Sequence, residues 1–146
     1  DFILACTPFS NMQPIDYVPI LNTAIEKKLI MYCANPDFET LDKNSENNII
    51  CMGAISEIYK KMGGVVIIKG KPEIDIYIET TKSINLDKTK TVAVGDSLFH
   101  DIMGANNFSI DSILVKSGIH KDLDTIKKLC KNHQIEPTYL IEDFSL

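Results

Sequence analysis

An apolar run changes to helical spacing at the Gly-Asp corner of Thr91-Val92-Ala93-Val94-Gly95-Asp96-Ser97-Leu98-Phe99-His100-Asp101-Ile102. The segment Val92–Val94 is short, rich in β-branched residues and without polar alternation, which predicts a buried parallel strand. Ser97 is a plausible helix N-cap, and Leu98, Ile102 and Ala105 follow at spacings that share one helical face. The stretch therefore predicts a strand, a tight loop and a helix.

Two carboxylates follow this predicted strand. Asp96 lies just past its carboxyl end, where open α/β sheets place their sites, and Asp101 lies one helical turn later. Convergent carboxylates suit Mg²⁺, which takes one or two of them and completes its shell with water and phosphate oxygens. Alternatively, both residues only favour the helix N-terminus through its dipole.

A lysine motif stands further upstream, after a predicted buried strand at Val65–Ile68. In Lys69-Gly70-Lys71-Pro72, the proline fits the first position of a helix that we expect to run to about Ile84. The inward residues of that helix are expected to be Ile74, Tyr77, Ile78 and Thr81. A cation is disfavoured at a helix start, so we expect a phosphate or the Asp96/Asp101 pair opposite Lys71. The alternative is a solvated surface lysine, which is our interpretation of Lys69.

The rest of the chain alternates predicted strands and helices. Strands are predicted at Phe2–Cys6, Leu29–Cys33, Ile49–Met52, Ile110–Val115 and Thr138–Ile141, and helices at Pro14–Lys28, Gly53–Met62 and Asp122–Lys131. Phe38–Asn48 is interpreted as a polar connector. This alternation predicts a parallel, doubly wound α/β fold.

Two loops carry further candidate residues. Asn35 and Asp37 flank Pro36 after a strand, and they either face a substrate or form an Asx-type turn with their own backbone. Ser117-Gly118-Ile119-His120 follows the strand at Ile110–Val115, on the same side as Asp96. His120 could be a proton carrier, but a loop histidine is more often a solvated surface residue, and the roles of His100 and His133 stay open.

Composition excludes several classes of function. The net charge is −5 and all 15 basic residues are lysines, which argues against nucleic acid as a partner. Cys6, Cys33, Cys51 and Cys130 form no C-x-x-C pair and are interpreted as buried, reduced thiols. No signal-peptide pattern and no apolar run of about 18 residues is visible, so we expect a cytoplasmic protein without a membrane span.

Three of these motifs resemble those of the haloacid-dehalogenase-like (HAD) hydrolases. Gly95-Asp96 with Asp101 resembles the last signature motif of that superfamily, and Lys69-Gly70-Lys71-Pro72 resembles the lysine motif of its class IIA members. Asn35-Pro36-Asp37 is similar to the class IIA cap signature. The resemblance implies a HAD-like, doubly wound parallel (Rossmannoid) core. Residues 1–68 would be part of an α/β cap, and residues 69–146 the C-terminal part of the core.

The same resemblance implies a magnesium-dependent phosphohydrolase acting on a small phosphorylated metabolite. Asp96 and Asp101 would serve the metal, and Lys71 would stabilise the phosphoryl group and the charge of the nucleophile. Asn35 and Asp37 would help to select the substrate, and Ser117 and Gly118 would border the site.

The aspartate nucleophile of this superfamily lies in an Asp-x-Asp motif at the end of a core strand, and no predicted strand here ends in one. We therefore expect the C-terminal portion of such an enzyme, inactive by itself. The alternative is a degenerate or split chain that pairs with a complementary half or self-associates, because an edge beside Val92–Val94 would be exposed. A response-regulator-like signalling domain is disfavoured, because no acidic cluster follows the first strand.

Overall fold

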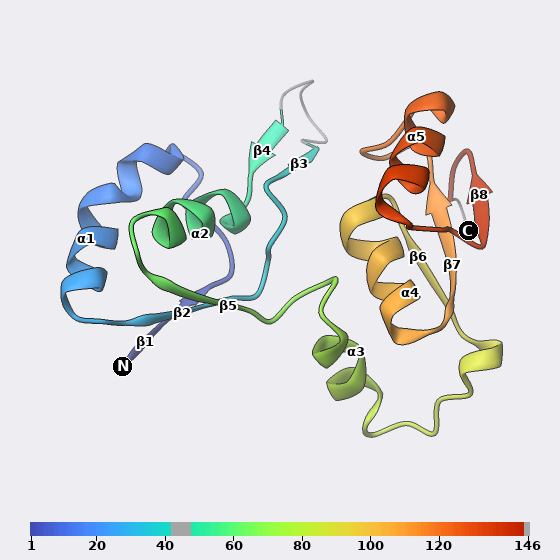
Figure 1. The fold of residues 1–146 in the computed structure, drawn as a ribbon, viewed down its shortest axis with the longest axis horizontal. Helices are drawn as coiled ribbons and strands as arrows, with labels where there is room; N and C mark the ends of the chain where they lie inside the picture. Colours follow the sequence, from blue (N-terminus) through green and yellow to red (C-terminus); the bar gives the residue numbers. More distant parts are fainter. Residues whose placement is uncertain (42–47, 145–146) are drawn as a thin grey trace. The chain divides into compact units, whose positions relative to one another are not determined.

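The computed structural model describes residues 1–41 and 48–144, which divide into two compact units, Asp1–Gly70 and Lys71–Leu146 (Figure 1). The first unit contains a three-stranded parallel sheet in the order β1-β2-β5. Its strands are β1 (Phe2–Ala5), β2 (Ile30–Cys33) and β5 (Val65–Ile68). The connections hold a 3-10 turn (Pro14–Tyr17) and the helices α1 (Val18–Glu26) and α2 (Met52–Lys61).

One face of this first sheet is packed and the other is open. Alternate strand residues such as Ala5, Met31 and Cys33 form a core with side chains from α1 and α2, which lie on that face (Figure 1). The hydroxyl of the fully buried Tyr59 donates a hydrogen bond of 2.7 Å to the Leu29 carbonyl and so ties α2 to the start of β2. Phe2 and Leu4, on the other face, are 62% and 64% exposed.

A hairpin replaces part of the predicted polar connector in this unit. β3 (Glu39–Leu41) pairs antiparallel with β4 (Asn48–Ile50), so the interpretation of Phe38–Asn48 as irregular was wrong for these strand residues. Alternation is hard to detect in strands this short, because each offers only three residues to the pattern. The middle of the predicted connector, residues 42–47, lies outside the described residues.

The second unit contains another three-stranded parallel sheet, in the order β6-β7-β8. Its strands are β6 (Val92–Gly95), β7 (Asp111–Val115) and β8 (Tyr139–Ile141). The helices are α3 (Ile74–Thr81), a 3-10 turn (Lys88–Lys90), a π-helical turn (Leu98–Ile102), α4 (Met103–Phe108) and α5 (Leu123–His133). Leu98, Ile102, Leu114, Ile126 and Ile135 form the core that joins the π-helical turn and α5 to the sheet. Both three-stranded sheets are parallel and carry helical crossovers, which confirms the predicted α/β fold.

The strands at Val92–Val94 and Val65–Ile68 were predicted to be buried, but both are partly exposed. Among the described residues β6 pairs only with β7, and Val92 and Val94 are 44% and 40% exposed. β5 is likewise at a sheet edge, and Val65 is exposed. An apolar run indicates a strand, but it does not say on how many sides that strand is covered.

The helix after Lys71 also differs from the prediction. α3 begins at Ile74 because Glu73 is still extended, so Pro72 precedes the helix. Tyr77 and Thr81 are partly buried as expected, on the side of α3 that packs against α4, but Ile74 and Ile78 are exposed.

The cysteines are all free. Cys33 and Cys51 are buried and Cys130 is half-buried, whereas Cys6 is exposed, because it lies beyond the end of β1. The interpretation as buried thiols was therefore wrong for Cys6. Within residues 1–41 and 48–144, none of the helices is both long and apolar enough to span a membrane.

Candidate functional site

The predicted site residues Asp96 and Asp101 follow β6 directly. β6 ends at Gly95, Asp96 lies in the loop, and the π-helical turn that begins at Leu98 carries the buried Asp101. The loop 116–119 follows β7, which is parallel to β6, so both loops lie at the same end of the sheet. Single π-helical turns are rare and are frequent at functional sites.

Asp101 binds Lys71. The Lys71 Nζ donates to Oδ1 of Asp101, and the Ser97 backbone N–H donates to its Oδ2 at 3.1 Å. Both carboxylate oxygens of Asp101 are therefore engaged. Gly95 is needed beside this pair, because a Cβ at that position would overlap the Asp101 carboxylate. The expected negative partner of Lys71 is thus Asp101.

Packing between α3 and α4 supports this ion pair. The ring of Tyr77 stacks on Phe108 with centroids 5.3 Å apart, and its hydroxyl lies against Gly104. The side-chain amide of Asn107 donates to the Pro72 carbonyl at 3.2 Å. Burial raises the pKa of Tyr77, the negative charge of Asp101 raises it further, and Lys71 opposes both. Gly104 and Asn107 thus hold the segment around Lys71 against α4, and no sequence motif marks either of them.

Asp96 is held by the loop that follows β7. The Ile119 backbone N–H donates to its Oδ2 at 3.1 Å, and Gly118 lies against the same carboxylate. The pKa of the neighbouring His120 is lowered because burial disfavours its charged form, and the charge of Asp96 partly offsets this effect. The ring of His120 contacts Phe99, with centroids 6.3 Å apart.

Ser97 occupies the predicted N-cap position, but its hydroxyl makes no capping bond. Instead, a hydrogen bond of 2.9 Å joins its Oγ to Nδ1 of His100. The Ser97 carbonyl accepts from the backbone N–H groups of Asp101 at 3.0 Å and Ile102 at 3.1 Å. The third histidine, His133, packs edge-on against Phe99 at a centroid distance of 4.9 Å.

The structure places Ser117 and Gly118 next to different neighbours. The Ser117 hydroxyl donates to Oδ1 of Asp143 at 3.0 Å, whereas Gly118 contacts Asp96. The sequence interpretation treated both residues as a border of the substrate site. That interpretation did not identify Ile119, which contributes only a backbone N–H, or Asp143, which is distant in sequence. Neither kind of contact leaves a local sequence pattern.

Asn35 and Asp37 belong to the first unit, whereas the other candidate residues belong to the second. Their loop packs against the start of α2: the Gly53 N–H donates to the Asp37 carbonyl at 3.0 Å, and a Cβ on Gly53 would overlap the Pro36 carbonyl. Burial, followed by the charge of Asp37, raises the pKa of the Cys51 thiol, while a hydrogen bond with the Asn35 side chain lowers it. Asn35 is therefore engaged with Cys51.

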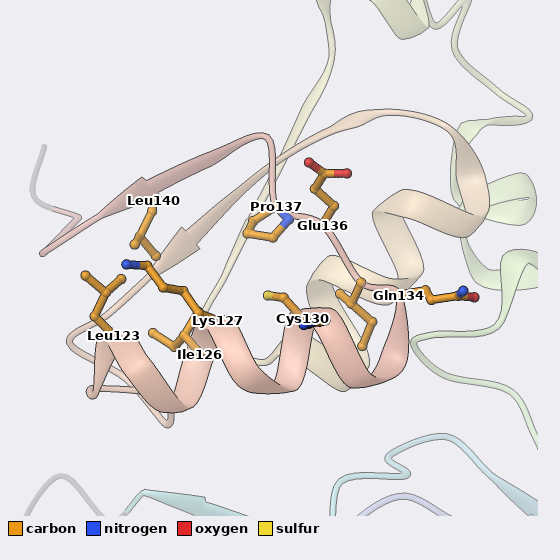
Figure 2. A pocket seen from close by; sticks show the side chains of 10 residues that line it. Leu123, Ile126, Lys127, Cys130, Gln134, Glu136, Pro137 and Leu140 are labelled. Atoms are coloured by element: carbon orange, nitrogen blue, oxygen red, sulfur yellow. The ribbon is translucent and has the colours of Figure 1, made fainter.

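Other features of the second unit do not add to this site. A groove of about 610 Å³ lies between α5 and the chain around β8, where Figure 2 shows Leu123, Ile126 and Cys130 along the helix opposite Leu140. Its lining includes neither Lys71 nor the two aspartates.

Asp122-Leu123-Asp124 has Asp-x-Asp spacing, but Asp122 caps α5 by accepting from the Thr125 N–H at 2.7 Å.

Comparison with known proteins identifies the family. The family model for HAD-hydrolase-like proteins matches residues 68–145, which include Lys71, Asp96 and Asp101. The chain belongs to the HAD-like hydrolases. An acid sugar phosphatase of Staphylococcus saprophyticus is 32% identical to it over 94 residues, which are 64% of this chain and 34% of that protein.

Solved structures of this superfamily share the fold. A haloacid dehalogenase-like hydrolase from Brucella suis aligns with a TM-score of 0.74 at 25% identity, over 99% of this chain and 55% of that one. A p-nitrophenyl phosphatase from Archaeoglobus fulgidus aligns with a TM-score of 0.72 at 19% identity, over 97% and 53%. This HAD-like chain thus spans about a third of the curated relative and about half of each structure.

Proposed function

We propose that this chain forms the lysine- and metal-bearing part of a magnesium-dependent phosphohydrolase that acts on a small phosphorylated metabolite. The observation that carries the proposal is the Lys71–Asp101 pair, which lies with Asp96 just past the carboxyl end of β6. The phosphatases among the relatives support the same reaction class. The four free thiols are consistent with the reducing cytoplasm that we propose as its location.

The donors suit Mg²⁺ better than a metal that needs a full protein cage. Within residues 1–41 and 48–144, no group of three or more His, Cys, Asp or Glu side chains gathers in a way that could hold a metal. Mg²⁺ binds through one or two carboxylates and keeps water and phosphate oxygens as its other ligands. Asp96 would be the direct ligand. When bound, the cation would neutralise charge on the phosphate.

Lys71 would act on the phosphate, and Asp101 would act on Lys71. Asp101 uses both oxygens for Lys71 and Ser97, so its main role would be to orient the lysine. Lys71 remains 49% exposed at its side chain and can therefore still reach an anion. It would stabilise the phosphoryl group and the attacking carboxylate by electrostatic attraction.

We further propose that the carboxylate nucleophile comes from outside residues 1–146, on the same polypeptide or on a partner. The second candidate function is therefore a non-catalytic half that becomes active when it is completed. The observation that favours it is the exposed edge at β6, where Val92 and Val94 are uncovered in the described chain. Asn35 and Asp37 would select the substrate, as predicted from the cap signature.

The test measures Mg²⁺ binding by calorimetry and phosphate release from p-nitrophenyl phosphate and a panel of sugar phosphates. We expect Mg²⁺ to bind the chain and Asp96→Asn to abolish that binding, because the substitution removes the ligand charge. Asp16→Asn is a matched control on an aspartate of the other unit. An unchanged Mg²⁺ titration in Asp96→Asn would refute the metal assignment. Phosphate release that depends on Asp96 would favour the enzyme over the non-catalytic half.

A further inference from the structure

The loop Lys116–Ile119 connects Asp96 to the chain beyond β8. On one side, Ile119 donates its backbone N–H to Oδ2 of Asp96 at 3.1 Å. Gly118 lies so close to the same carboxylate that a Cβ would overlap both its Oδ2 and its Cβ. Gly118 has no positive φ that would by itself require glycine, so the requirement is for space. A methyl group at this position would have to displace Asp96.

The other side of the loop is bonded to the end of β8 and to the two residues that follow it. The Lys116 N–H donates to the Ile141 carbonyl at 2.9 Å, which continues the β7–β8 ladder. Nζ of Lys116 donates to Oε1 of Glu142 at 2.6 Å, and the Ser117 hydroxyl donates to Oδ1 of Asp143 at 3.0 Å. The side chain of Lys116 is only 15% exposed, so this lysine lies along the protein surface rather than in free solvent. The last residue of β8 and the two residues after it thus bind the loop.

We propose that Ser117, Gly118 and Asp143 are positioning residues for Asp96. The segment after β8 fixes the loop, and the loop fixes the carboxylate through one N–H donor and one close contact. Ser117 therefore acts through its bond to Asp143 rather than through substrate. The purpose of this positioning, to aim Asp96 at Mg²⁺, rests on the proposed function. The contacts between the loop and Asp96 do not depend on that function.

The experiment follows two signals in the whole chain: the amide chemical shift of Ile119 by NMR, and the Mg²⁺ affinity by calorimetry. We expect Gly118→Ala to shift the Ile119 amide in the same way as Asp96→Asn, and to weaken Mg²⁺ binding by about 10- to 100-fold, the usual effect of losing a group that orients a metal ligand. Ser117→Ala should give a smaller change in both signals. Ser117→Thr keeps the hydroxyl and should restore them. Ser83→Ala, an exposed serine elsewhere in the unit, is the control.

The two signals separate the positioning from the function. An Ile119 amide that does not respond to Asp96→Asn, or a Ser117→Thr variant as impaired as Ser117→Ala, would overturn the positioning. If the wild-type chain binds no Mg²⁺ while the Ile119 amide responds to both Asp96→Asn and Gly118→Ala, the contact stands and the proposed function fails. If Gly118→Ala does not fold, the pair Ser117→Ala and Ser117→Thr decides.

Discussion

Lys71 and Asp101 are 30 residues apart in sequence, and the ammonium of the first binds Oδ1 of the second. Lys71 stands before α3 and Asp101 lies in the π-helical turn before α4, so the pair joins the two helical segments that flank β6 in the chain. Asp101 also accepts from the Ser97 N–H and is itself buried. The charge of Asp101 is thus stabilised by two donors, the Lys71 ammonium and the Ser97 N–H. Together they fix the orientation of the carboxylate.

Asp101→Asn should destabilise the chain. The substitution removes the charge that holds Lys71 and weakens the acceptor for the Ser97 N–H, and losing a charged hydrogen bond at a buried group costs about 1 to 3 kcal/mol. Unfolding by urea, followed by circular dichroism, measures the free energy of unfolding. Glu79→Gln is the matched control, because the Lys82–Glu79 pair is exposed and should contribute little. Equal effects of the two variants would contradict the structural role of the Lys71–Asp101 pair.

Gly104→Ala should also destabilise the chain, although alanine is the better helix former. A methyl group on Gly104 would overlap the Tyr77 hydroxyl, and overpacking of this kind costs about 1 to 3 kcal/mol. That cost exceeds the gain of up to about 1 kcal/mol from helix propensity. Thermal and urea unfolding measure whether the free energy of unfolding falls, as expected, or rises.

A double variant tests the cause of this destabilisation. Tyr77→Phe removes the hydroxyl that the new methyl would meet first, so Gly104→Ala should cost less in the Tyr77→Phe background than in the wild type. Additive effects of the two substitutions would show that Gly104 and Tyr77 do not interact.

His120 should make stability depend on pH. Burial holds the pKa of its folded-state imidazole below the ordinary value of 6.5, which applies to the unfolded chain. The unfolded chain therefore binds the proton first as the pH falls. The free energy of unfolding should be unaffected by this group above about pH 6.5, fall as the pH decreases through that value, and level off below the folded pKa.

The variant His120→Gln isolates this contribution. Urea unfolding of both proteins between neutral and mildly acidic pH should show the wild type losing more stability than the variant as the pH falls. His133→Gln controls for the other histidine that packs on Phe99. Parallel pH profiles for wild type and His120→Gln would mean that the folded chain does not disfavour the charged imidazole.

The sequence predicts most strands and helices of this chain because their apolar runs have clear periods and end at Gly, Pro or Asp. β5 has the predicted bounds, and Asp122 starts α5 as a side-chain cap. Contacts between residues that are distant in sequence are harder to predict. The charge of Lys71 requires an anion, so Asp101 could be anticipated. The parallel strands predict that Ser117-Gly118-Ile119 lies on the side of Asp96, but not that the Ile119 N–H binds its carboxylate. The apolar run Val92–Val94 does not by itself show whether β6 lies in the middle of a sheet or at its edge, and the expectation of an exposed edge came from the missing Asp-x-Asp strand.

The exposed edge at β6 gives the last prediction. Within the described residues the strand pairs on one side only, and Val92 and Val94 are uncovered, so the chain should self-associate through this strand. Val94→Lys should lower the association, because a charged side chain on an edge strand opposes pairing with another strand. Sedimentation velocity over a range of concentrations measures it. Ile84→Lys, an exposed isoleucine outside both sheets, is the control for added charge. A wild-type chain that is monomeric at every concentration, or an equal effect of the two substitutions, would mean that β6 does not recruit a second strand in this way.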